Sequence, residues 1–211
     1  MTPPVKVMLV DDHAVVREGY RRLLEREPDI EVVAEAANAA QACERARALR
    51  PDVVVMDIAL PGTSGLETMR RMLADRPQLR VLMFSMYDDA IFCSRALQAG
   101  ALGYLSKASA PEVLLEAIRA VSRGEHYMSP DVAANMRRSA SSPGWSGLES
   151  LTAREFEVLR LLVQGMVVKE IGARLGLSEK TVANHQSAIR EKLGARNGVQ
   201  LARLAAQLGL A

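Results

Sequence analysis

Five side chains in the first half of the chain have the types and spacing needed to handle a phosphoryl group. Asp11 and Asp12 follow the run VKVMLV, and Asp57 follows DVVVM. Ser85 closes the run RVLMFS, and Lys107 follows GYLS. Carboxylates are the oxygen ligands that Mg²⁺ prefers, while a lysine and a serine can hold an anion. A carboxylate in such surroundings can itself attack phosphorus and form an aspartyl-phosphate.

Each of these residues also has an ordinary explanation. Strand ends are often acidic, adjacent aspartates are usually solvated, and a lone serine or lysine indicates nothing specific. In a buried position the Asp11–Asp12 pair needs a cation, because like charges repel and resist desolvation. Asp57 is the best candidate nucleophile, since it ends a continuous apolar run and precedes the tight turn LPGTSG. The presence of all five at strand ends favours the phosphoryl hypothesis.

The composition fits two domains of ordinary size. The chain has 211 residues, of which 49% are hydrophobic. Its two cysteines lack the spacing of metal ligands, and two thiols in a chain of this size are typical of a reduced, cytoplasmic protein. We recognise no signal peptide and no run of membrane length, so we expect a cytoplasmic protein without a membrane partner. Residues 1–125 carry 16 Lys and Arg against 18 Asp and Glu, whereas residues 148–211 carry 9 against 6. This asymmetry favours partners of opposite charge for the two parts.

Apolar runs alternate with amphipathic stretches over residues 1–125, which predicts a parallel α/β sheet. Strands are expected at 5–10, 31–36, 52–57, 80–84 and 102–105, and helices at 13–26, 38–49, 64–75, 88–99 and 110–123. In such sheets ligands bind beyond the carboxyl ends of the strands, near the point where the strand order reverses. If strands one, three, four and five are neighbours, the five candidate residues share one pocket.

A linker over residues 126–147 should contain one short helix in SPDVAANMRR and a flexible stretch, SASSPGWSG. Residues 148–211 then have a purely helical period, which predicts four short helices with capping signals at Thr152, Ser178 and Asn197. Within them, KEIGARLGLSEKTVANH has the pattern of a helix-turn-helix: a short helix, a turn near Gly176, and a polar second helix.

The polar face of that second helix is suited to a DNA major groove. Val182, Ile189 and Leu193 recur on one side, which leaves short and polar side chains on the other. Asparagine can pair with adenine, and arginine can pair with guanine or contact phosphate. A face that is merely solvated is the alternative. The predicted DNA-contacting residues are Lys180, Thr181, Ala183, Asn184, Ser187 and Arg190, with Lys169 and Lys192 at the rim.

The motifs LVDDH, VVVMDIALPGTSGLE, VLMFSMYDD and AGALGYLSKAS resemble the receiver domain of bacterial response regulators across residues 5–123. The resemblance implies a five-stranded parallel flavodoxin-like (βα)5 sheet with phosphorylation of Asp57. It implies Mg²⁺ held mainly by Asp12 and Asp57, with Asp11 nearby. The residues that it implies as phosphate contacts and as an aromatic switch are Ser85, Lys107 and Tyr104. An aromatic residue on a strand is, however, usually part of the core.

The motifs LTAREFEVLRLLVQG, KEIGARLGLSEKTVANH and IREKLGA resemble the four-helix DNA-binding domain of the LuxR type across residues 148–210. One departure is GMVVKEIG, where that family often has a small polar residue before Lys-Glu-Ile. A receiver followed by this module resembles the NarL/FixJ class of response regulators. The resemblance implies a transcription regulator that a partner histidine kinase phosphorylates and that binds DNA as a homodimer when active.

Two rival functions stay open at this point. The receiver could respond to a ligand or partner without phosphorylation, or the chain could be a phosphatase of the haloacid dehalogenase type. Such a phosphatase needs an aspartate two residues after its nucleophile, where this chain has Ala59. We therefore expect no enzyme beyond self-phosphorylation from a donor and slow self-dephosphorylation. Slow hydrolysis is predicted because Ala59 cannot orient a water and bulky Tyr87 lies two residues after Ser85.

Overall fold

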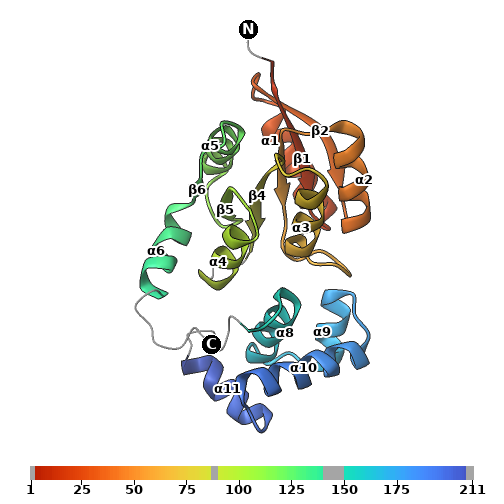
Figure 1. Cartoon of the computed structure of the whole chain (residues 1–211), viewed down its shortest axis with the longest axis vertical. Coiled ribbons are helices and arrows are strands. Elements are labelled where there is room, and N and C mark those ends of the chain that lie inside the picture. The colour runs from red at the N-terminus through yellow and green to blue at the C-terminus, as the bar shows by residue number, and fades with distance from the viewer. Residues whose placement is uncertain (1–2, 87–89, 140–149, 208–211) are drawn as a thin grey trace. The chain divides into compact units, whose positions relative to one another are not determined.

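The computed structural model describes residues 3–86, 90–139 and 150–207, and the chain divides into two compact units (Figure 1). The first covers Met1–Arg137 and the second Arg138–Ala211. The predicted domain limits at residues 125 and 148 stay predictions, and most of SASSPGWSG lies outside the described residues. In the described part of the chain, every helix is too short or too polar to cross a membrane.

The first unit is a parallel sheet with helices between its strands (Figure 1). The strand order is β2-β1-β3-β4-β5-β6, so strands one, three, four and five are neighbours, which is the condition for the candidate residues to share one pocket. The elements are β1 (Val5–Val10), α1 (Ala14–Leu24), β2 (Ile30–Ala36), α2 (Ala39–Leu49), β3 (Val53–Met56), α3 (Gly65–Asp75), β4 (Arg80–Ser85), α4 (Ala90–Gln98), β5 (Gly103–Ser106), α5 (Pro111–Ser122), β6 (Tyr127–Met128) and α6 (Pro130–Ser139). The α/β fold class is confirmed, and α6 is the short helix expected in SPDVAANMRR.

The sheet has six strands where the sequence predicted five. The added strand, β6, pairs with β5: the Tyr127 N–H donates to the Leu102 carbonyl at 3.0 Å, and the Ser129 N–H donates to the Tyr104 carbonyl at 3.2 Å. It escaped prediction because it has only two residues, too few for a strand period to be visible. It also carries the first unit past residue 125, since α6 follows it directly.

Helices cover the sheet on both faces, which explains why its strands are continuous apolar runs. One core cluster joins alternate strand residues, such as Val7, Val55 and Phe84, to residues of α1 and α5, such as Leu24 and Ile118. The residues between them along the strands are also buried, so they face the opposite side. The edge of the sheet formed by the strand carboxyl ends is thereby left as the place where polar side chains can gather.

The second unit is helical throughout its described part: α8 (Ala153–Val163), α9 (Val168–Leu175), α10 (Glu179–Leu193) and α11 (Gly198–Gln207). Three predicted caps are present: Thr152 forms a capping box with Glu155, the Ser178 hydroxyl accepts from the Thr181 N–H, and Asn197 accepts from the Gln200 N–H. Gly176 ends α9 in the left-handed region, at φ 64°.

Close packing fixes the turn between α9 and α10. A Cβ added at Gly172 would lie 2.8 Å from the Leu177 carbonyl, so the turn approaches α9 more closely than a side chain would allow. Val182 and Ile189 of α10 are fully buried as predicted, while Leu193 is partly buried. Helix α10 contacts both α8 and α9, and this packing turns its polar side outward.

Candidate functional site

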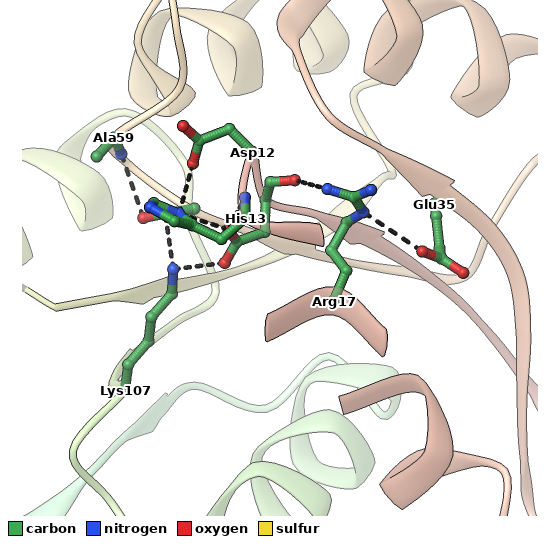
Figure 2. A network of polar contacts seen from close by, with 8 residues as sticks. Asp12, His13, Arg17, Glu35, Ala59 and Lys107 are labelled. Atoms are coloured by element: carbon green, nitrogen blue, oxygen red, sulfur yellow. Dashed lines mark hydrogen bonds and ion pairs between the residues drawn. The ribbon is translucent and has the colours of Figure 1, made fainter. Parts of the chain in front are cut away.

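The ammonium group of Lys107 lies between two carboxylates (Figure 2). Its Nζ is 2.5 Å from Asp11 Oδ2 and 2.6 Å from Asp57 Oδ2. The side chain of each of the three residues is less than a tenth exposed. They follow β1, β3 and β5, so the observed strand order places three distant parts of the chain at one edge of the sheet.

Main-chain contacts hold Asp57 in place. Its N–H donates to the Val10 carbonyl at 2.8 Å, which continues the pairing of β3 with β1 beyond the end of β3. The turn after Asp57 folds back tightly, and the Gly65 N–H donates to the Ile58 carbonyl at 2.8 Å. A Cβ added at Gly65 would lie only 1.8 Å from the Asp57 carbonyl oxygen. The second glycine in LPGTSG, Gly65, is therefore required by this close approach.

Burial and ion pairing act in opposite directions on the two central charges. Burial raises the pKa of Asp57, and the neighbouring Lys107 only partly offsets that effect. Burial would lower the pKa of Lys107, but the carboxylates of Asp57 and Asp11 outweigh it and raise that pKa. The ammonium therefore stays protonated, and the Asp57 carboxylate is more basic than an exposed aspartate. A more basic carboxylate is a better nucleophile toward phosphorus.

Asp12 and His13 lie beside this centre and are exposed. The Nδ1 atom of His13 is 2.8 Å from Asp12 Oδ1 and 3.2 Å from Asp11 Oδ1, and its main-chain N–H donates to Asp11 Oδ1 at 2.8 Å. One ligand atom from each of Asp11, Asp12, His13 and Asp57 falls within 4.8 Å of all the others. Three carboxylates at this spacing fit a hard divalent cation such as Mg²⁺.

A second line of contacts, absent from the sequence predictions, anchors the turn after β1 (Figure 2). The Arg17 guanidinium donates from Nη1 to the Asp11 carbonyl oxygen at 2.6 Å, and its Nε is 3.3 Å from Glu35 Oε2. Arg17 lies four residues after His13, about one helical turn, so its position on the site side of α1 could be inferred from spacing. Glu35 comes from β2, and sequence alone gives no signal for that pairing.

The remaining predicted residues of this site have main-chain or core positions. Ser85 is fully buried at the end of β4, and its carbonyl accepts from the Lys107 N–H at 2.8 Å. Tyr104 is fully buried on β5. The Ala59 N–H donates to Asp57 Oδ1 at 3.2 Å, and its methyl group has no polar atom to offer (Figure 2). Tyr87 lies outside the described residues.

In the second unit, most predicted DNA contacts line one side of α10. The Arg190 guanidinium donates to the Ser187 hydroxyl at 3.3 Å, and that hydroxyl donates to the Ala183 carbonyl at 3.1 Å. The exposed members of the set are Lys180, Ala183, Asn184 and Ser187 on α10 and Lys169 on α9, while Thr181 and Arg190 are partly exposed. The side is small, polar and free of large apolar groups, as a groove-reading surface requires.

Lys192 has a structural contact besides its predicted rim position. Its Nζ donates to Glu155 Oε2 at 2.7 Å, and the same oxygen accepts from the Thr152 N–H at 2.6 Å. Burial would raise the pKa of Glu155, but these partners outweigh it and lower that pKa. His185 of α10 is partly buried, and burial lowers its pKa, which favours the neutral ring. Leu201 of α11 is buried, whereas Leu208 lies outside the described residues.

Known families match both units of the chain. Residues 7–119 match the family described as "Response regulator receiver domain", and residues 149–205 match "Bacterial regulatory proteins, luxR family". Transcriptional regulatory protein UhpA of Escherichia coli (strain K12) is 40% identical over 200 residues, which cover 94% of this chain and 96% of that protein. Response regulator GacA of Pseudomonas syringae pv. syringae (strain B728a) is 36% identical over 208 residues, covering 98% and 97%.

Two solved structures are similar to this chain. A two-component response regulator of the LuxR family from Aurantimonas sp. SI85-9A1 is 45% identical with a TM-score of 0.63, over 65% of this chain and 98% of that one. RcsB from Salmonella enterica serovar Typhimurium, solved bound to the promoter rprA with the phosphomimetic BeF3⁻, is 25% identical with a TM-score of 0.67, over 96% and 98%.

Proposed function

This chain belongs to the response regulators of two-component systems in the NarL/FixJ class, DNA-binding transcription regulators that join a receiver domain to a LuxR-type domain, and we propose that phosphorylation of Asp57 controls its binding to DNA. The observation that supports this most directly is the buried contact of Lys107 with both Asp11 and Asp57. It sets a nucleophile beside a fixed positive charge at the open edge of a parallel sheet.

The transfer can be followed atom by atom. An oxygen of Asp57 attacks the phosphorus of a phosphohistidine on a sensor histidine kinase, the P–N bond breaks, and the imidazole leaves with the bonding electron pair. Negative charge then gathers on the phosphoryl oxygens, and Lys107 stabilises it from within hydrogen-bond reach of the nucleophile. The Lys107 side chain does not have to move for this role, because it already contacts Asp57 before the donor arrives.

The acidic group would hold Mg²⁺ through Asp11, Asp12 and Asp57, whose donor atoms lie together. The bound ion supplies positive charge that neutralises the incoming phosphoryl group. Asp12 is exposed and is therefore the carboxylate that a cation arriving from solvent meets first. Arg17 holds the main chain at Asp11, which keeps the adjacent carboxylates at the site.

The response to phosphorylation uses Ser85 and Tyr104 in this proposal. The Ser85 hydroxyl hydrogen-bonds a phosphoryl oxygen, and Tyr104 turns inward. The fully buried position of Tyr104 in this structure is the inward position that we assign to the active state. Passing from a mostly inactive to a mostly active population requires roughly 5 kcal/mol of preference for the active state. Charge-assisted hydrogen bonds to a phosphoryl group can supply a large part of that preference.

The polar side of α10 is the proposed DNA-reading surface. Asn184 and Arg190 would contact base edges, while Lys180, Thr181 and Lys169 would contact phosphates. RcsB, a related chain, has been solved as dimers bound to DNA, which supports binding of this chain as a dimer when active. A regulator of this kind acts where the chromosome lies, and for a bacterial chain this compartment is the cytoplasm.

Phosphate-dependent DNA binding by matched variants tests the proposal. Full-length chain is treated with Mg²⁺ and beryllium fluoride, and its affinity for operator DNA is measured by fluorescence anisotropy. We expect the treatment to tighten DNA binding of the native chain and to leave Asp57→Asn unchanged. Asp52→Asn is the control, because Asp52 lies just before β3 at its other end and an asparagine can still accept from the Lys6 N–H. An unchanged affinity of the native chain would contradict the proposal.

Hydrolysis of the aspartyl-phosphate should be slow in this chain. Position 59 presents a methyl group where a polar side chain would orient an attacking water. We expect a phosphoryl lifetime of many minutes, and Ala59→Asn should shorten it. The lifetime is measured by Phos-tag electrophoresis after removal of the donor, and an equal or longer lifetime in Ala59→Asn would contradict this view. Substitution of Ala59 by Val serves as the control, since it adds volume without a polar group.

A further inference from the structure

A cavity of about 320 Å³ lies between α2 and α3, two helices that pack side by side (Figure 1). Its lining comes from the carboxyl-terminal halves of both helices and from the residues just before β4. The cavity is therefore at the amino ends of β3 and β4, whereas Asp57 follows the carboxyl end of β3 at the opposite edge of the sheet. Its volume falls at the lower end of the range for sites that bind small molecules.

The floor of this cavity is apolar and uncharged. The lining residues with the lowest exposure are Ala46, Met72 and Leu79, each less than a tenth exposed. The partly buried thiol of Cys43 also lines the cavity, and burial raises the pKa of that thiol, so it stays protonated at neutral pH. The carbon body of a small molecule can therefore be buried here without meeting a buried charge.

The rim of the cavity has a surplus of positive charge. Three arginines line it against a single acidic residue, Asp75, which pairs with Arg47. The Arg76 guanidinium donates from Nη1 to the Pro51 carbonyl at 2.9 Å, a contact that fixes its position and uses one of its five N–H groups. Within the described residues, the exposed Arg50 side chain makes no hydrogen bond or ion pair.

We propose that this cavity binds a small organic phosphate, a phosphate monoester with an apolar body. Such a group carries a charge of about −1.5 to −2 at neutral pH, which matches the surplus of two positive charges on the rim. Guanidinium groups pair with phosphate through parallel hydrogen bonds, and Arg50 and Arg76 are the arginines without a carboxylate partner among the described residues. The proposal is independent of the proposed function, because no lining residue belongs to the acidic site or to α10.

The ordinary explanation for these arginines is support of helix ends. Helices α2 and α3 both end at the cavity, and cationic side chains stabilise the carboxyl-terminal end of a helix. The Arg50 backbone caps α2 in the left-handed region, at φ 47°, where glycine would be less strained, so the cap does not itself call for arginine. On the ordinary explanation, loss of the Arg50 charge alters stability only, whereas the proposal predicts loss of a ligand.

The test is calorimetric titration of the full chain with phenyl phosphate in the absence of Mg²⁺, for which we expect a single saturable site. Phenol and inorganic phosphate should each bind at least about tenfold more weakly, because each lacks one half of the contacts. Arg50→Gln should weaken phenyl phosphate binding about tenfold, the value of a charged hydrogen bond. Arg70→Gln is the matched control, because Arg70 is exposed on α3, carries the same charge and does not line the cavity.

A second readout locates the ligand. Cys43 lines the cavity and is partly exposed, whereas Cys93 is fully buried, so iodoacetamide should label Cys43 first. Saturating phenyl phosphate should slow this labelling about threefold or more, as measured by mass spectrometry. Equal affinities of Arg50→Gln and Arg70→Gln, or labelling of Cys43 that phenyl phosphate does not slow, would overturn the inference. An altered affinity in Asp57→Asn would place the ligand at the acidic site and would overturn it as well.

Discussion

The acidic site of the first unit and the proposed DNA-reading side of α10 are built in opposite ways. Lys107 meets Asp11 and Asp57 across 96 and 50 residues of sequence, and all three side chains are nearly buried. The α10 surface comes from 15 consecutive residues, and its predicted DNA-contacting side chains are wholly or partly exposed. One site is assembled by the whole sheet, whereas the other needs only a helix that is held in place.

Because of this difference, substitutions in the acidic site should affect both function and stability, whereas substitutions on the polar side of α10 should affect function alone. A buried charge that loses its partner costs several kcal/mol, so residues of the acidic site should affect folding as well as phosphorylation. Exposed side chains on a helix usually change stability by less than about 0.5 kcal/mol, so α10 can change what it reads without affecting the fold. The predictions below follow the expected change in the free energy of unfolding, from the largest to the smallest.

Removing the central ammonium should have the largest effect. Lys107→Met leaves two buried carboxylates facing each other, and we expect the free energy of unfolding at neutral pH to fall by about 3–5 kcal/mol. Urea denaturation followed by circular dichroism measures it. In an Asp57→Asn background the same substitution should cost clearly less, because one of the two charges is already gone. Equal costs in both backgrounds would show that the three groups are not coupled.

Adding one methyl group behind Asp57 should have the next largest effect. Gly65→Ala places a Cβ against the Asp57 carbonyl and should lower the free energy of unfolding by about 2–3 kcal/mol. Gly19→Ala in α1 is the control, since its Cβ would meet nothing within 4 Å and alanine favours the helix by about 0.5–1 kcal/mol. If both variants had the same stability, the close approach at Gly65 would not be real.

In the second unit, Lys192→Ala should lower the free energy of unfolding by about 1 kcal/mol. This is less than the loss of a fully buried charged hydrogen bond would cost, because Lys192 is partly exposed. The folded chain lowers the pKa of Glu155, so the associated stability is present above the unfolded-state pKa and is lost as the pH falls through the folded-state value. Urea melts at several acidic pH values should show a weaker pH dependence in Lys192→Ala. An unaltered pH profile would mean that this ion pair contributes nothing.

The smallest change in stability, below about 0.5 kcal/mol, is expected for Asn184→Ala and Lys180→Ala. Their effects should appear in DNA binding instead. Asn184→Ala should lose about 1–3 kcal/mol of discrimination at one base pair, whereas Lys180→Ala should weaken all sequences alike and reduce the salt dependence. Binding to a panel of singly altered operators measures both. If both variants lost the same affinity for every operator in the panel, the base-reading surface would have to lie elsewhere.

The sequence predicted best those features that are encoded locally. The strand that leads to Asp57 and the caps at Thr152 and Ser178 are each specified within a few residues, and the structure has all of them. The Lys107 contacts also depend on the strand order, which the alternation of strands and helices left open and which the resemblance to receiver domains implied through a flavodoxin-like sheet. Pattern and topology together therefore sufficed to place the centre of the candidate site.

The features that were missed depend on tertiary contacts or on very short segments. Arg17 reaches Glu35 across two elements, and no spacing in the sequence reports that pair. Strand β6 is too short to show a period, and the Glu155–Lys192 contact joins two helices. His13 was visible beside the acidic pair, but which way an exposed side chain points depends on its neighbours in space.

The two-residue length of β6 has a consequence for self-association. An unpaired strand edge invites the backbone of another molecule to extend the sheet, and natural proteins guard against this with short edge strands and prolines. At this border the ladder ends within a few residues, because Pro130 lies two residues beyond β6 and has no N–H to donate. This edge of the sheet therefore offers little backbone with which a second copy of the chain could pair.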